Sequence, residues 1–141
     1  MIHEEICTYE VCKLAKEKGF DGSGCLKHYD QNGLLRSNRS FSRFDLTIEE
    51  LYKHDTPNEV QVYAPTQSLL QRWLREGKNL YISIIAHAKS KSVYYEWEVR
   101  YISALGNMNK ASSVMTIETY RYNTYELALE DALKYALENL V

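Results

Sequence analysis

The strongest constraint on the fold lies in residues 65–88, where a helical pattern passes directly into a strand pattern. In the first part, apolar residues recur at helical spacing on one stripe, made of Leu69, Leu70, Trp73 and Leu74. Either Pro65 takes the first helical position or Thr66 caps the helix, and Gly77 is expected to end it. The second part alternates as a strand with one buried face does, through Leu80, Ile82, Ile84, Ala86 and Ala88.

A second alternating run follows a short polar link and predicts a hairpin between residues 79–88 and 93–103. Pairing Ala88 with Val93 puts both apolar rows on the same side of the sheet, with Ile84 opposite Trp97. A shift of one residue would set the apolar row of one strand against the polar row of the other. The sequence therefore predicts the register as well as the hairpin.

Helices are expected at about residues 9–18, 66–76 and 124–140. Thr8 is a candidate N-cap of the first helix. Asn123 stands three residues before Glu126, which is the spacing of a capping box at the start of the last helix. Glu130 and Lys134 have the i,i+4 spacing of a favourable ion pair on its exposed side.

Further strands are expected in a hairpin at residues 25–29 and 33–36, and again at 114–120. Residues 37–63 show no clear periodicity apart from a short extended run before Pro65. Together the patterns predict an α+β fold, with an antiparallel sheet of about 3–5 strands packed by helices. A chain of 141 residues is near the usual size of one domain, so residues 1–141 are expected to form a single domain.

Composition argues against several classes of function. The 17 Lys and Arg residues nearly balance the 19 Asp and Glu residues, so no overall charge favours nucleic acid or an anionic membrane. No apolar run approaches the ~20 residues of a membrane-spanning helix, and no secretory signal is visible. Three cysteines are too few, and odd in number, for a disulfide framework. Reduced thiols and a cytoplasmic location are expected.

Three blocks of sequence carry a resemblance to a known group. They read TYEVCKLAKEKGF at residues 8–20, PTQSLLQRWLRE at 65–76 followed by an NLYISI strand, and YELALEDALKYALE at 125–138. Together they resemble small uncharacterised proteins of phages and prophages of gut Bacteroides-type bacteria. That group has no established activity, so the resemblance implies a phage-encoded product in the bacterial host and assigns no catalytic residues.

Candidate catalytic and metal-binding residues are few. Cys7, Cys12, Cys25 and His28 could be written as a zinc ligand set, since thiolate and imidazole suit a tetrahedral site. Cys7 and Cys12 are five residues apart, however, which does not place them on one helix face, and small buried thiols are the alternative. The histidines lie in different predicted elements and in no known catalytic signature. We therefore expect no catalytic residue, metal or cofactor.

One polar segment could contact nucleic acid. It interleaves three arginines with two phenylalanines, namely Arg36, Arg39, Phe41, Arg43 and Phe44. Arginine can bind phosphate while an aromatic ring stacks on an unpaired base. The alternative is a solvated loop whose phenylalanines anchor it to the core.

The polar face of the long hairpin is the other candidate surface. Its tyrosines and histidine include Tyr81, His87 and Tyr94. Tyrosine is enriched in protein interfaces because it combines a large contact area with a polar tip. The corresponding prediction is a homodimer or an unknown protein partner, and the alternative is a second layer of helices over this face.

These observations favour a non-enzymatic protein-interaction or accessory factor. A nucleic-acid-associated protein that uses residues 36–44 is the alternative, and an enzyme of unknown class is the third possibility. No membrane partner is expected.

Overall fold

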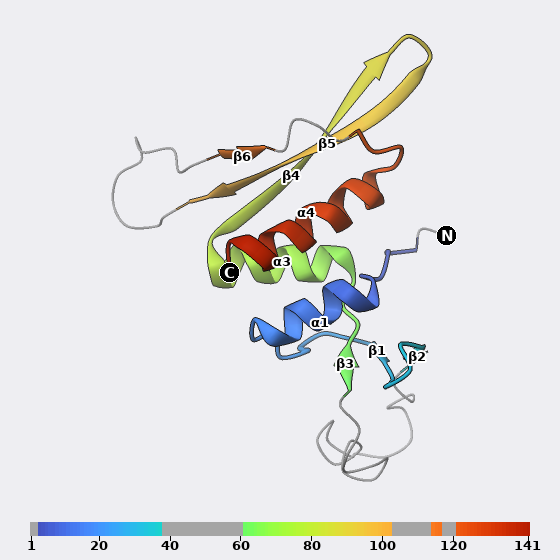
Figure 1. The fold of residues 1–141 in the computed structure, drawn as a ribbon, viewed down its shortest axis with the longest axis vertical. Helices are drawn as coiled ribbons and strands as arrows, with labels where there is room; N and C mark the ends of the chain where they lie inside the picture. The colour runs from blue at the N-terminus through green and yellow to red at the C-terminus, as the bar shows by residue number, and fades with distance from the viewer. Residues whose placement is uncertain (1–2, 38–60, 103–113, 117–120) are drawn as a thin grey trace.

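Three helices in the described part of the chain lie on one side of a long β-hairpin (Figure 1). The computed structural model describes residues 3–37, 61–102, 114–116 and 121–141. The helices are α1 (Tyr9–Glu17), α3 (Gln67–Lys78) and α4 (Tyr125–Asn139). Helix α4 is central, because it packs against α1, α3 and both strands of the hairpin. None of the helices described is both long enough and apolar enough to cross a membrane.

The described strands form two antiparallel sheets of three strands each. The first has the order β2-β1-β3, and its strands are β1 (Lys27–Tyr29), β2 (Leu35–Ser37) and β3 (Val62–Tyr63). The second has the order β4-β5-β6, and its strands are β4 (Leu80–Lys89), β5 (Ser92–Tyr101) and β6 (Val114–Thr116). The predicted α+β class is confirmed. The strands are divided between two sheets because β1 pairs with β3 beside α1, at the other end of the molecule from β4 and β5 (Figure 1).

The register of the long hairpin is the predicted one. Ala88 pairs with Val93 and Ile84 pairs with Trp97. Near the ends of β4 and β5 that lie opposite the turn, the helices bury the inner face of the hairpin. The buried residues there are Leu80, Ile82, Trp97 and Val99. These side chains join the apolar faces of the three helices in one core.

The far end of this hairpin extends past the helices (Figure 1). We call residues 85–94 the hairpin arm. Its residues are exposed except for His87 and Tyr94, which are partly exposed. Ile85 is 39% exposed on one face and Val93 is 54% exposed on the other, so neither face of the arm is covered by the described helices.

Threonine caps all three described helices. The hydroxyl of Thr8 accepts from the N–H of Val11, as predicted, and the hydroxyl of Thr66 accepts from that of Leu69. Helix α1 ends in a Schellman motif, in which Phe20 N–H donates to Ala15 O over 2.9 Å. Gly19 makes this possible with a φ of +94°.

Two predicted helix ends were wrong. Helix α3 continues through Gly77 to Lys78 and ends at Asn79, whose φ of +57° is left-handed. Asparagine tolerates this region, so glycine is not required there. The N-cap of α4 is Thr124, one residue after Asn123, and its hydroxyl accepts from the Leu127 N–H.

The predicted pair between Glu130 and Lys134 was also wrong, because each side chain binds another helix. Lys134 lies 2.9 Å from the carboxylate of Glu10 on α1. Glu130 accepts from the Thr8 N–H over 2.7 Å and from Gln67 Nε2 over 2.9 Å. Both residues therefore connect α4 to the other helices.

Candidate functional site

The polar face of the long hairpin holds a cluster of aromatic and polar side chains at the base of the arm. The His87 ring stacks on the Tyr94 ring, with centroids 5.1 Å apart and planes inclined by 13°. His87 Nε2 also lies 3.1 Å from Oε2 of Glu96. The Arg121 guanidinium lies 4.6 Å from the centroid of the Tyr94 ring. We call His87, Tyr94, Glu96 and Arg121 the arm cluster.

Strand geometry explains why these residues meet. His87 and Tyr94 are directly paired across β4 and β5, and Glu96 follows two residues after Tyr94, on the same face. Arg121 lies on the side of β5 that faces away from β4, because the next residue, Tyr122, forms a bridge with Tyr95.

Of the residues predicted for this surface, the structure brings two together. His87 and Tyr94 are in contact, whereas Tyr81 lies six residues along β4 from His87 and pairs with Arg100. Arg121 was missed, because residues 117–122 carry no signal that would have placed it beside Tyr94. A cation on a tyrosine face and a stacked imidazole give the arm cluster polar and aromatic contact groups, a combination frequent in protein interfaces.

The exposure of the inner face of the arm was missed as well. Val93 was placed in the apolar row expected to be buried, whereas it is 54% exposed, and Ile85 on the polar face is 39% exposed. Sequence alternation predicts which side chains share a face, but it does not show how far the covering helices reach.

The segment predicted to contact nucleic acid is described only at its start. Arg36 Nε lies 2.9 Å from Oδ2 of Asp30 within the first hairpin. The hydrogen bond from Arg36 lowers the pKa of the Asp30 carboxyl below its usual range, and the backbone N–H of Leu34 adds to this effect. Arg39, Phe41, Arg43 and Phe44 lie outside the residues that the structure describes.

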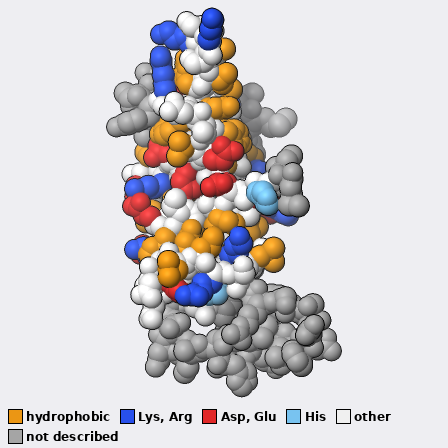
Figure 2. Space-filling view, turned by 90° about the vertical axis from the view of Figure 1, so that its right-hand side faces the viewer, with side chains coloured by type: hydrophobic (Ala, Val, Ile, Leu, Met, Phe, Trp, Pro, Cys, Tyr) orange, Lys and Arg blue, Asp and Glu red, His pale blue; other side chains and the backbone are white. Residues whose placement is uncertain are grey.

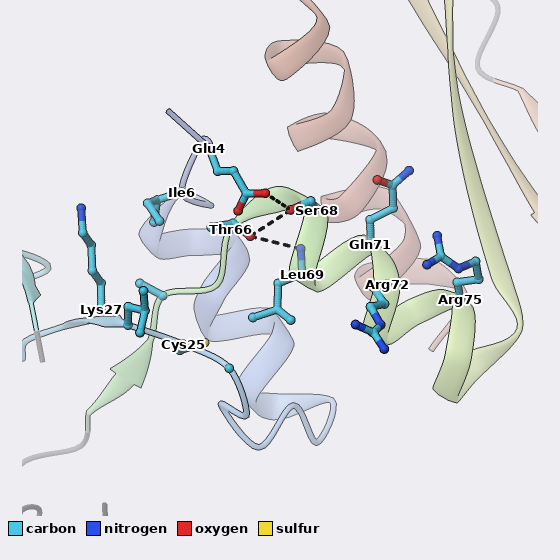
Figure 3. Close-up of a pocket in the computed structure, with 13 residues that line it drawn as sticks. Glu4, Ile6, Cys25, Lys27, Thr66, Ser68, Leu69, Gln71, Arg72 and Arg75 are labelled. Carbon is cyan, nitrogen blue, oxygen red and sulfur yellow. Dashed lines mark hydrogen bonds between the residues drawn. The ribbon is translucent and has the colours of Figure 1, made fainter. Parts of the chain in front are cut away.

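A groove of about 640 Å³ runs along α3, between residues 66–75 and residues 24–27 (Figure 3). Within it the Ser68 hydroxyl donates to Glu4 Oε1 over 3.1 Å and lies 3.1 Å from the Thr66 hydroxyl. Lys27 lies at one end of the groove, and Arg72 and Arg75 lie toward the other (Figure 3). The basic side chains that line the groove are therefore divided between its two ends.

On the face in Figure 2, acidic side chains gather across the middle and basic side chains gather at the upper end, so the face carries charges of both signs. This agrees with the near balance of acidic and basic residues in the sequence.

The cysteines are placed as small buried groups. Cys7 and Cys12 are buried and Cys25 is partly buried. The hydrogen bond with Cys12, together with burial, raises the pKa of the Cys7 thiol far above its usual range. Burial raises the pKa of Cys25 to about 12. The Cys7 and Cys25 thiols are therefore protonated at neutral pH and are weak nucleophiles in the folded protein.

Cys7 and Cys12 do not share a helix face, because Cys7 precedes the N-cap of α1 whereas Cys12 lies within the helix. The two residues are nevertheless in contact, since Cys12 Sγ lies 3.5 Å from the carbonyl oxygen of Cys7. Among the described residues, no group of three or more His, Cys, Asp or Glu side chains is arranged to hold a metal ion.

Comparison with protein-family models gave no match. Comparisons with curated proteins and with solved structures gave no match either. The protein is therefore described by its own fold, which is an α+β domain with a projecting hairpin arm. The surfaces of that arm are its main candidate binding surfaces.

Proposed function

We propose that this protein is a non-enzymatic interaction factor that binds a protein partner through the hairpin arm. The observation that carries the proposal is the exposure of the arm on both faces, including Ile85 and Val93. The setting in which it acts, a phage or prophage product inside its bacterial host, rests on the sequence resemblance.

Physical chemistry supports this use of the arm. A two-stranded hairpin without a packed face is at best marginally stable in water. Ile85 and Val93 lie on opposite faces of the arm, so a partner on either face would bury an exposed apolar side chain. The arm cluster adds Tyr94 and Arg121, residue types enriched where proteins meet.

The proposal is tested by covalent capture of the partner. A photo-crosslinking residue at Lys91, at the tip of the arm, is expected to give a discrete protein adduct in host extract treated with nuclease. Val93→Asp in the same protein is expected to abolish the adduct, because it places a charge in the interface. An adduct that persists in Val93→Asp would contradict the proposal.

Leu127→Asp supplies the matched control. Leu127 is 56% exposed, close to the 54% of Val93, but it lies on α4 outside the arm. This variant is expected to keep the adduct. Capture that disappears after nuclease treatment would favour the alternative role, association with nucleic acid.

A further inference from the structure

One edge of the long hairpin has no strand beside it in the described part of the chain. Strand β4 is the outer strand of its sheet, and β5 is its one described strand partner. Strand β5, in contrast, pairs with β6 and with the bridge at Tyr122 on its other side. An open strand edge presents backbone N–H and C=O groups that can pair with another strand.

The backbone groups at this edge follow from the register. Ile102 N–H donates to Asn79 O over 3.0 Å, so residues 79 and 102 form a hydrogen-bonded pair. Such pairs alternate along an antiparallel ladder. The even-numbered residues of β4 therefore direct their N–H and C=O groups away from β5. An independent contact agrees, since the Ile82 carbonyl accepts from the Gln71 side chain over 2.9 Å.

The open edge is bounded at both ends. The Gln71 bond occupies the carbonyl of Ile82 at one end. At the other end the strand enters the turn at Ser90, where φ is +57°. Between them, the outward groups of Ile84, Ala86 and Ala88 make no hydrogen bond to any other described residue. These three residues are spaced symmetrically about Ala86.

We propose that a second copy of this chain occupies the open edge, with the two β4 strands antiparallel about a twofold axis at Ala86. In this register Ala86 pairs with Ala86 of the second copy, and Ile84 pairs with its Ala88. Every outward N–H and C=O of the three residues is then bonded. Shifting the register by two residues in either direction leaves some of these groups unpaired.

The side chains suit this register. On the polar face, Ile85 lies opposite His87 of the second copy, so an exposed apolar side chain gains a neighbour. On the inner face the pairs are Ile84 with alanine and alanine with alanine, which allow close approach. Each copy thereby extends its sheet into that of the other, an isologous contact of the kind most soluble homo-oligomers use.

Charge is complementary in the same register. Lys89 lies opposite Ser83 of the second copy, and Ser83 pairs with Glu98 on β5. The small serine side chain leaves room for the lysine ammonium to approach the Glu98 carboxylate, whose Oε1 also lies 2.9 Å from Arg100 of its own copy. The two Lys89 residues are about 20 Å apart, six residues at ~3.3 Å each, so they do not repel each other strongly.

This inference rests on the proposed function in one respect, since the arm is again the contact surface. It adds the identity of one occupant, a second copy, and a register.

The first test uses the register. In a Cys25→Ser background, which leaves only buried native thiols, Ala86→Cys is expected to form a disulfide-linked dimer on mild oxidation.

The expected Cα–Cα distances between the two copies explain why residue 86 is chosen for the crosslink. Hydrogen-bonded residues in an antiparallel pair have Cα atoms about 5.5 Å apart, within the usual range for a disulfide. Ala88→Cys is the matched control, because the two copies of residue 88 would be roughly 13 Å apart, four residues at ~3.3 Å. Equal crosslinking of the two variants, or none with Ala86→Cys, would overturn the proposed pairing.

A second measurement does not depend on cysteine. Ala86→Pro removes an N–H that points away from β5, so it leaves the β4–β5 ladder intact. Sedimentation is expected to show a dimer for the unmodified chain and a shift to monomer for Ala86→Pro at equal concentration. A monomer for the unmodified chain at every concentration would overturn the inference.

The two proposals fail separately. If Ala86→Cys does not crosslink while the Lys91 adduct to a host protein still depends on Val93, self-pairing is excluded and the proposed function stands. If the host adduct is absent and the Ala86→Cys dimer forms, the occupant of the arm is a second copy alone, and the proposed partner from the host is excluded.

Discussion

Gln67 and Glu130, which are 63 residues apart in the sequence, connect α3 to α4 through a 2.9 Å hydrogen bond from Nε2 to Oε2. Gln67 is 5% exposed, and its amide also donates to the carbonyl of Glu126 over 3.0 Å. The other oxygen of Glu130 accepts the backbone N–H of Thr8, at the start of α1. One carboxylate thus joins all three described helices.

Replacing Glu130 by glutamine is expected to destabilise the fold. Glutamine keeps one carbonyl acceptor but sets an NH₂ group against either the Thr8 N–H or the Gln67 amide, leaving a donor without an acceptor. The expected loss of unfolding free energy is about 1–3 kcal/mol. Chemical denaturation monitored by circular dichroism measures it. Glu138→Gln, an exposed change on the same helix, should have little effect, and equal losses for the two variants would contradict this role.

The N-cap of α4 can be assigned by comparing neighbouring residues. Thr124→Ala removes the hydroxyl that accepts from the Leu127 N–H, with an expected loss of about 1 kcal/mol. Asn123→Ala is expected to cost much less. Thermal unfolding of the two variants measures the difference, and the reverse order would restore Asn123 as the cap.

Two glycines with similar backbone conformations are expected to respond differently to alanine. Gly19 and Gly22 have φ values of +94° and +80°. An added Cβ would have no neighbour within 4 Å at Gly19 but would lie 2.2 Å from Cδ2 of Tyr63 at Gly22. Both variants should lose about 1 kcal/mol from the backbone. Gly22→Ala should lose about 1–3 kcal/mol more from the clash, measured by urea denaturation. Equal losses would contradict the close contact with Tyr63.

Cys25 should react slowly with alkylating reagents in the folded protein. Burial raises its pKa from 9.0 to about 12, so little thiolate is present at neutral pH. The rate of iodoacetamide labelling, followed by mass spectrometry, is expected to keep rising with pH up to about pH 12 in the folded protein. In the unfolded chain the rate should level off above pH 9.0, the ordinary pKa of the thiol. Rapid labelling of the folded protein at neutral pH would contradict the raised pKa.

The raised pKa of Cys25 also affects the stability of the fold. The unfolded thiol releases its proton near pH 9 and the folded thiol only near pH 12, so the unfolding free energy should fall as pH rises between these values. Cys25→Ser removes this group and should reduce the fall.

Much of the fold could be predicted because local pattern and final packing agree. Ile84 pairs with Trp97 because each belongs to an apolar row of period two, a shift of one residue would set these rows against polar ones, and the short link between the strands limits larger shifts. Thr8 caps α1 through a contact three residues away, which a sequence pattern can show.

Contacts between distant segments were not predictable in this way. Glu130 has a lysine at i,i+4, yet it binds Thr8 and Gln67, because the packing of three helices brings their N–H groups to it. Arg121 reaches Tyr94 through the bridge made by Tyr122. The exposure of the hairpin arm depends on where α4 begins relative to the sheet, which the alternation within β4 and β5 does not contain.

The packing of α1 against α4 has a consequence for the timing of folding. These helices lie near opposite ends of the sequence, and Lys18 Nζ donates to the Val141 carbonyl over 3.0 Å. During synthesis α4 is the last described element to emerge, and until then α1, α3 and the long hairpin have no central helix to cover them. The part of the core that α4 covers therefore cannot be completed until α4 has been made, and a nascent chain that stalls before residue 125 would leave those apolar surfaces exposed to the cell's chaperones.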